Sequence, residues 1–125
     1  MKKLSLFFFL LISIDASSDL KRDLDKELDP LMDKVINWRH DIHQNPELSN
    51  REYRTSKKVE NHLRSLGIKV ETKIAYTGVV GLIEGSLPGP TIALRADMDA
   101  LPVVEKTGLP YASKDKTKYL GQTVG

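Results

Sequence analysis

Residues 93–102 read Ala-Leu-Arg-Ala-Asp-Met-Asp-Ala-Leu-Pro, an apolar run that gives way to one cation and two carboxylates and closes on a proline. Residues 91–94 have the composition expected at the end of a buried strand. Open α/β sheets bind their ligands outside the carboxyl ends of such strands. If the protein carries out chemistry, we expect its site to begin at this stretch.

Arg95, Asp97 and Asp99 are the candidate site residues of this stretch. The two aspartates alternate along an extended backbone, which points their side chains to opposite sides and argues against a shared acid–base pair. A carboxylate at a strand end can ligate a metal, orient a metal-bound or catalytic histidine, or cap backbone amides. Arg95 can pair with Asp97 structurally or grip a substrate carboxylate. The residues alone leave these roles open.

The histidines offer a second, weaker candidate for a metal site. His40 and His43 lie three residues apart on an expected helix and could share a metal in principle. A zinc site needs at least one more protein ligand, and the sequence has one other histidine and no cysteine. We therefore interpret them as helix-end residues that contact terminal carbonyls or solvent, and His62 as a solvated residue.

Composition limits the kind of protein this is. A chain of 125 residues suffices for one domain with a modest core. Its net charge of +2 comes from acids and bases mixed throughout, so no basic block marks a nucleic-acid surface. The absence of cysteine excludes disulfides within the sequence.

The first residues have the layout of a secretory signal peptide. Lys2 and Lys3 precede an apolar stretch at 4–14, and small residues follow. Ala16 and Ser18 fit the small-residue rule, which predicts a signal peptide at 1–18, cleavage after Ser18 and a secreted or periplasmic protein. An uncleaved membrane anchor is the weaker alternative, because a span needs about 20 apolar residues.

Two helices are expected after this segment. Residues 19–29 form either a short amphipathic helix or a solvated, charged N-terminal arm. Asp29 as N-cap and Pro30 at the first helical position predict a helix that ends near His43. Asn45 and Pro46 terminate it, because the residue before proline is disfavoured in the α region.

A capping box predicts where the next helix starts. Ser49 and Glu52 have its spacing, and Leu48 with Tyr53 has the spacing of a hydrophobic staple. This helix is expected to end near residue 66, with Gly67 as its left-handed cap.

Strands are expected at 68–74, 79–84 and 91–94, and residues 103–125 are expected to be mostly irregular. This order of elements predicts an α/β layered domain with a mixed sheet. The sheet would be incomplete, since its most apolar strand needs neighbours that these residues do not supply.

Four motifs stand out along the chain: Trp-Arg-His-Asp-Ile-His-Gln-Asn-Pro-Glu-Leu-Ser at 38–49, Gly-Val-Val-Gly at 78–81, Leu-Arg-Ala-Asp-Met-Asp-Ala-Leu-Pro at 94–102 and Leu-Pro-Tyr-Ala-Ser at 109–113. In order and spacing, they resemble the N-terminal part of the metal-dependent amidohydrolases of the aminoacylase and carboxypeptidase superfamily. The most similar branch contains hippurate hydrolases, N-acyl-amino-acid deacylases and auxin-conjugate hydrolases.

This resemblance implies a two-metal enzyme, using zinc or manganese, that hydrolyses the amide bond of an N-acyl amino acid or peptide. The metals would activate a water and a glutamate would take its proton. The resemblance also implies a catalytic domain interrupted by a smaller lid or dimerisation domain, and hence a possible homodimer of the full-length enzyme. Neither nucleic acid nor membrane is an expected partner after signal cleavage. In the superfamily the strand-end motif is His-x-Asp; here Arg95 replaces the histidine and Asp97 matches the aspartate that orients it.

The resemblance also implies that 30–125 is the N-terminal portion of a catalytic domain. Residues 120–125 resemble the lead-in to a Cys-Gly-His-Asp segment that carries the first metal ligands in this branch. We therefore expect no metal ligands within this chain, and no hydrolysis by these residues alone. The alternative is an exported, non-catalytic binding or interaction module that retains the fold.

Overall fold

The structure is a computed structural model that describes residues 15–124. By its internal contacts the chain divides into residues 1–39 and 40–125, and each part is described by itself. Residues 1–14, which hold most of the predicted signal peptide, lie outside the described residues. Within 15–124, no helix combines the length and apolarity that crossing a membrane requires.

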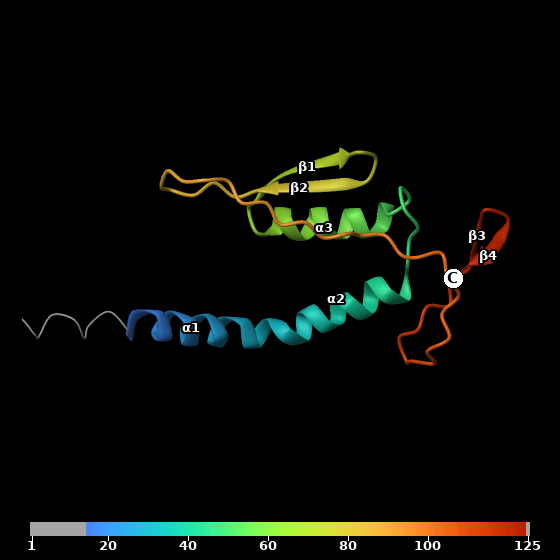
Figure 1. Ribbon diagram of the computed structural model, residues 1–125, viewed down its shortest axis with the longest axis horizontal. Helices are drawn as coiled ribbons and strands as arrows, with labels where there is room; N and C mark the ends of the chain where they lie inside the picture. The colour runs from blue at the N-terminus through green and yellow to red at the C-terminus, as the bar shows by residue number, and fades with distance from the viewer. Residues whose placement is uncertain (1–14, 125) are drawn as a thin grey trace, which may run out of the picture. The chain divides into compact units, whose positions relative to one another are not determined.

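The first part is helical along its described length. It contains α1 (Asp15–Leu28), the short 3-10 helix η1 (Asp29–Leu31) and the start of α2 (Met32–Gln44) (Figure 1). Of the two alternatives for 19–29, the helix is therefore confirmed. Its apolar face is uncovered within the described residues, with Leu20, Leu24 and Leu28 each more than half exposed.

Asp29 does not act as the N-cap predicted for the second helix, although the helical turn η1 does begin at this residue. Leu28 keeps right-handed helical angles, with φ −81° and ψ −36°, and no side chain caps the turn that follows. Pro30 has no backbone N–H and would leave a hydrogen bond missing inside a continuous α-helix. Here it lies in the short 3-10 turn η1 between α1 and α2. The end of α2 is confirmed at Gln44, where Asn45 Nδ2 donates to the Asp41 carbonyl at 2.8 Å.

The capping box predicted for α3 (Tyr53–Ser65) is also wrong. The cap is Glu47, whose two carboxylate oxygens accept from the Arg54 and Thr55 amides at 2.9 and 2.8 Å. Ser49 and Glu52 instead use their side chains on Asp99 and Thr77, which lie far along the chain. A carboxylate on two exposed amides is a favourable cap, because it also meets the positive end of the helix dipole.

The hydrophobic staple fails for a related reason. Leu48 is 8% exposed and belongs to the small core, whereas Tyr53 is 69% exposed. The two side chains therefore do not cover each other.

The end of α3 matches the prediction. Gly67 has φ +75°, its amide donates to the Arg64 carbonyl at 3.0 Å, and the Ile68 amide donates to the Leu63 carbonyl at 3.2 Å. This pair of bonds is a Schellman motif, and it turns the chain directly into the first strand.

The predicted strands at 68–74 and 79–84 form an antiparallel hairpin of β1 (Lys69–Ile74) and β2 (Gly78–Leu82). The hairpin packs against α3 (Figure 1), and its inward residue Val70 is 8% exposed. A Cβ at Gly81 would lie 3.2 Å from side-chain atoms of Leu63 and Ile68. Glycine at this position therefore permits the close approach of helix and sheet.

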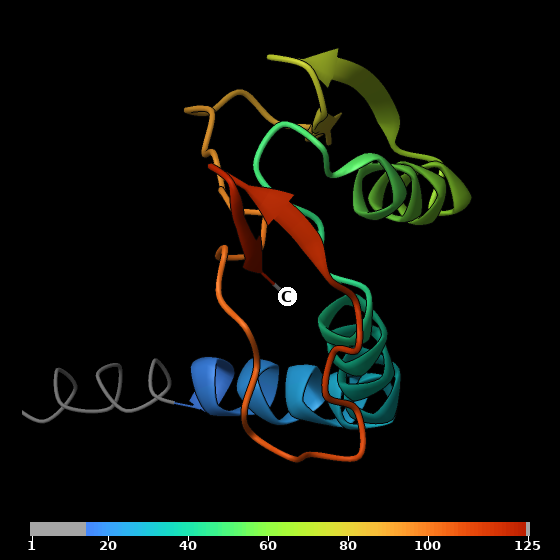
Figure 2. The ribbon, with the colours of Figure 1, turned by 90° about the vertical axis from the view of Figure 1, so that its right-hand side faces the viewer.

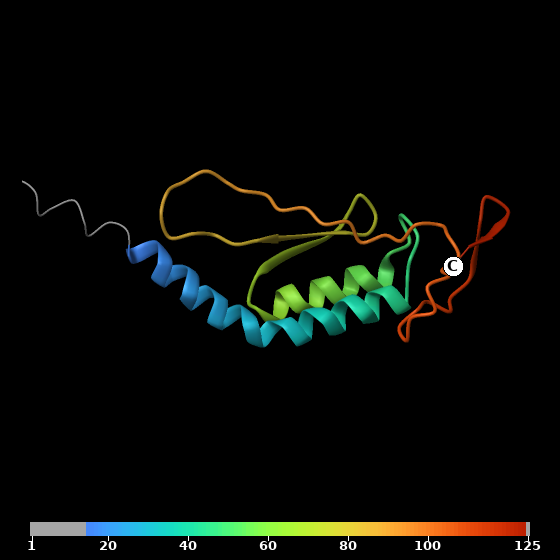
Figure 3. The same cartoon turned by 60° about the horizontal axis from the view of Figure 1, so that its bottom comes forward.

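The third strand, predicted at 91–94, does not form, and this prediction is corrected. Its residues are irregular, with Ile92 82% and Leu94 98% exposed. A strand needs a hydrogen-bonded neighbour, and no described segment pairs with 91–94. After β2 the chain instead turns back and returns without regular structure (Figure 3). Parallel pairing in the described residues is limited to one bridge, between Leu48 and Ala100.

A second hairpin in the region expected to be irregular was missed. It joins β3 (Thr117–Tyr119) to β4 (Gln122–Val124) (Figure 2). Its turn residues Leu120 and Gly121 have φ +49° and +80°, as a type I′ turn requires. Leu-Gly is not one of the favoured turn dipeptides, and the strands are three residues each, so the sequence signal is weak.

We predict that Glu47→Ala lowers the free energy of unfolding by about 1 kcal/mol, the usual cost of removing a helix cap. Urea unfolding followed by circular dichroism measures this change. The control is Glu84→Ala, because Glu84 is exposed in an irregular segment. Equal stability of the two variants would show that Glu47 does not cap α3.

Candidate functional site

The stretch that carries the candidate site residues is bound to the loop between α2 and α3. The Ala100 amide donates to the Glu47 carbonyl at 2.8 Å, and Leu48 forms a bridge with Ala100. Asp99, the residue before Ala100, accepts a hydrogen bond through Oδ2 from Ser49 Oγ at 2.5 Å. Two of the motifs singled out in the sequence, 38–49 and 94–102, are thus in direct contact.

Arg95 and Asp97 form an ion pair on the surface. The distance from Arg95 Nη2 to Asp97 Oδ1 is 2.6 Å. The Arg95 side chain is 85% exposed and the Asp97 side chain 62%. An ion pair this exposed contributes little to stability. Both groups face solvent, and the orienting role predicted for Asp97 stays a prediction.

Glu52 is a buried carboxylate that is near enough to Asp99 to interact with its charge. It is 7% exposed and accepts from Thr77 Oγ1 at 2.6 Å and from the Asn50 amide at 2.9 Å. Burial raises the pKa of Glu52, but these hydrogen bonds outweigh it, so that the pKa is lowered below its ordinary value. The nearby negative charge of Asp99 acts in the opposite direction. Glu52 is therefore ionised and holds the hairpin turn to the start of α3.

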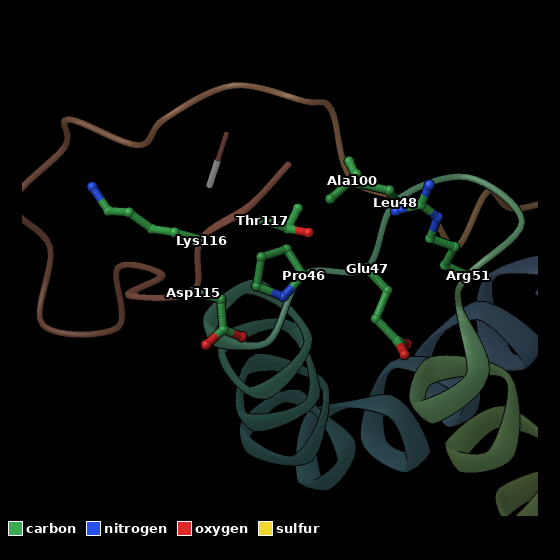
Figure 4. A pocket seen from close by; sticks show the side chains of 8 residues that line it. All are labelled: Pro46, Glu47, Leu48, Arg51, Ala100, Asp115, Lys116 and Thr117. Atoms are coloured by element: carbon green, nitrogen blue, oxygen red, sulfur yellow. The ribbon is translucent and has the colours of Figure 1, made fainter. Parts of the chain in front are cut away.

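A shallow pocket of about 190 Å³ adjoins the contact between the two motifs (Figure 4). Pro46, Leu48 and Ala100 are its apolar lining residues. Figure 4 shows the Glu47 carboxylate directed toward α3, consistent with its capping role. The remaining lining residues are Arg51, Asp115, Lys116 and Thr117.

The histidines of α2 contact a distant aromatic residue, which was not expected from the sequence. The His43 side chain is also 43% exposed, in keeping with the solvent alternative. The His40 ring stacks on Tyr111 with centroids 3.8 Å apart, and the His43 ring meets the same tyrosine edge-on at 5.6 Å. His43 Nε2 lies 3.0 Å from Glu105 Oε1. No local pattern in the sequence links α2 to these residues, which lie more than sixty positions further along.

Glu105, which contacts His43, has a strongly lowered pKa. Hydrogen bonds from the Thr107 hydroxyl, His43 and the Ser113 amide lower the pKa of Glu105 to about 2. Its side chain is 14% exposed. Glu105 thus binds the loop at 105–113 to the end of α2.

The residues of 15–124 do not by themselves compose a metal site. No group of three or more histidine, cysteine, aspartate or glutamate side chains in this range could hold an ion. The sequence-predicted residues Arg95, Asp97 and Asp99 lie together on one stretch. Glu47 and Ser49 hydrogen-bond to the end of this stretch. In the sequence, Ser49 was noted only as part of a helix-start signal, and Glu47 was not singled out.

Comparison with known sequences identifies hydrolases. No family model matches the chain. It is 56% identical over 85 residues to thermostable carboxypeptidase 1 of Saccharolobus solfataricus, a match covering 67% of this chain and 22% of the relative. It is 49% identical over 83 residues to the N-acetyl-L-cysteine deacetylase of Bacillus subtilis, covering 66% and 20%. The hippurate hydrolase of Campylobacter jejuni is 50% identical over 76 residues, covering 61% and 20%.

A solved structure gives the same result for the fold. A dinuclear metal-binding peptidase of the M20 family from Bacillus subtilis superposes with a TM-score of 0.64 at 43% identity. The superposition covers 70% of this chain and 24% of that one. The prediction of an incomplete α/β domain is confirmed, and the structure is a partial domain of that fold. In place of the predicted mixed sheet, the described residues form two separate antiparallel hairpins. The chain spans about a fifth of the length of the curated relatives it matches.

We predict that Glu105→Gln lowers the free energy of unfolding at neutral pH. The difference in this free energy between the variant and the parent should become smaller in acid. The folded-state pKa of about 2 lies below the ordinary value of 4.5, so the carboxylate stabilises the fold fully above pH 4.5. That contribution is lost as the pH falls from 4.5 toward 2. Urea unfolding across this range measures it.

The exposed strand residue Glu71 supplies the control for this measurement, as Glu71→Gln. A constant difference between Glu105→Gln and the parent across the whole pH range would contradict the assigned role of Glu105.

Proposed function

We propose that this chain forms part of the catalytic domain of a metal-dependent hydrolase of the M20 family, because it is similar to a carboxypeptidase, a deacetylase, a hippurate hydrolase and an M20 peptidase. The observation that carries the proposal is the identity of about half the aligned residues with hydrolases over two thirds of the chain. The contact between 47–49 and 99–100 supports it, because it brings together two of the four motifs that carry the resemblance.

The substrate class we propose is an N-acyl amino acid. Two of the similar proteins are named for such substrates, an N-acetyl-L-cysteine deacetylase and a hippurate hydrolase. Arg95 suits this class, because an exposed guanidinium can bind the carboxylate of the amino-acid part in a bidentate manner. Binding would require Arg95 to exchange its present partner, Asp97, for the substrate.

A divalent metal is the cofactor we propose for the complete enzyme, as two ions of zinc or manganese. The support is the dinuclear metal-binding peptidase that shares the fold. Asp97 is proposed to orient a metal ligand rather than to bind an ion. The chain spans about a fifth of the length of the relatives it matches. We expect these 125 residues alone not to hydrolyse amides.

Two further proposals concern the setting of the enzyme. The layout of residues 1–18 supports export to the periplasm or outside the cell. A homodimer of the complete enzyme is proposed from the resemblance alone. An exported binding module without catalysis remains the competing candidate, and it would bind N-acyl amino acids without turning them over.

Asp97→Asn is predicted to reduce metal content or activity roughly 10- to 100-fold in the protein expressed from its own gene, as loss of a ligand-orienting carboxylate does. Metal analysis and hydrolysis of N-benzoylglycine and N-acetyl amino acids measure this. Asp33→Asn, on the exposed start of α2, is the control. Unchanged metal content and turnover would reduce Asp97 to a surface partner of Arg95, and a parent protein without turnover would favour the binding module.

Phe8→Arg is predicted to keep the protein inside the cell, because it places a charge in the apolar stretch at 4–14. The parent should be exported with a mature N-terminus at Asp19, which mass spectrometry of the exported fraction identifies. Lys21→Ala, in the charged arm, should be exported like the parent. Equal export of the Phe8→Arg variant would refute the signal peptide.

A further inference from the structure

Ser49 and Asp99 join two segments that lie 50 residues apart in the sequence. The hydroxyl donates to the carboxylate at 2.5 Å, and the next residue along, Ala100, donates its amide to the Glu47 carbonyl at 2.8 Å. A side-chain bond and a main-chain bond on successive residues define both the position and the direction of the chain at 99–100. We refer to this pair of bonds as the Ser49–Asp99 contact.

The loop side of the contact is itself well held. The Glu47 carboxylate accepts from the first amides of α3, and Leu48 is 8% exposed. Glu52 accepts from the Asn50 amide at 2.9 Å, which fixes the loop between them. The loop therefore provides a rigid support against which the other segment can be placed.

On the other side of the contact, the stretch before Asp99 has few hydrogen bonds to the rest of the described structure. Between the end of β2 and Asp99, the described main chain makes no backbone hydrogen bond to another segment. The ion pair of Arg95 with Asp97 is internal to this stretch, and Leu94 is 98% exposed. Among the described residues after the β1–β2 hairpin, Ala100 thus makes the first backbone hydrogen bond to another segment.

We infer that Ser49 is a positioning residue for Asp97 and acts through Asp99. Asp97 is two residues before Asp99, so its Cα lies within about 7 Å of a fixed point. Loss of that fixed point would let Asp97 move by more than the roughly 1 Å that catalytic geometry tolerates. This inference rests on the proposed function for the role of Asp97, and it gives Asp99 a role that its position in the sequence left open.

The test compares Ser49→Ala, Ser49→Thr and the control Ser86→Ala in the full chain. Ser86 is exposed in the irregular segment after β2, so its removal matches the chemical change without touching the contact. Ser49→Ala should accelerate hydrogen exchange of the Ala100 amide roughly tenfold, because a hydrogen bond to a charged group is lost. The heteronuclear NOE of the Asp97 amide should fall. Ser49→Thr should restore both values, since it keeps the hydroxyl.

Unchanged exchange at Ala100 in Ser49→Ala, relative to Ser86→Ala, would overturn the inference. So would accelerated exchange at Ala100 with an unchanged NOE at Asp97, because the contact would then exist without positioning that residue. In the protein expressed from its own gene, Ser49→Ala should lower kcat about 10- to 100-fold with little change in KM. Absence of hydrolysis in the parent would refute the proposed function, while the two NMR readouts would still decide the positioning of Asp97.

Discussion

Glu47 serves three parts of the structure at once. Its carboxylate caps α3, its carbonyl receives the Ala100 amide, and its neighbour Leu48 lies in the small core. Glu47 therefore hydrogen-bonds both to the helix that packs against the hairpin and to the stretch that carries Asp97. A change at Glu47 would shift both together, because the cap and the carbonyl bond are made by one rigid turn of chain.

Local signals in the sequence were sufficient where the partners are near neighbours. Gly67 could be predicted as a left-handed cap, and the β1–β2 hairpin follows from alternation between polar and apolar residues. Ser49 and Glu52 show the limit of such reasoning. They have the spacing of a capping box, yet their side chains bind Asp99 and Thr77, 50 and 25 residues away. Choosing between local and distant partners requires the tertiary structure.

The candidate site divides in the same way. The Arg95–Asp97 pair lies within one short stretch and could be expected from the sequence. The stacking of His40 on Tyr111 and the contact of His43 with Glu105 could not, because no periodicity relates α2 to residues 105–111. The strand expected at 91–94 had the right composition but no partner among the described residues. Apolar composition predicts that a segment can pair, and only the neighbouring segment determines whether it does.

The sequence separation of the Ser49–Asp99 contact has a consequence for the order of folding. Closing a loop of this length costs about 3 to 4 kcal/mol of chain entropy, whereas α3, its Schellman turn and the β1–β2 hairpin close over a few residues each. Local elements therefore have the kinetic advantage, and the stretch with Asp97 is placed after they exist. An interaction that forms late stabilises the folded state mainly by slowing its unfolding. The candidate site would then be the last part of this region to assemble and the first to open.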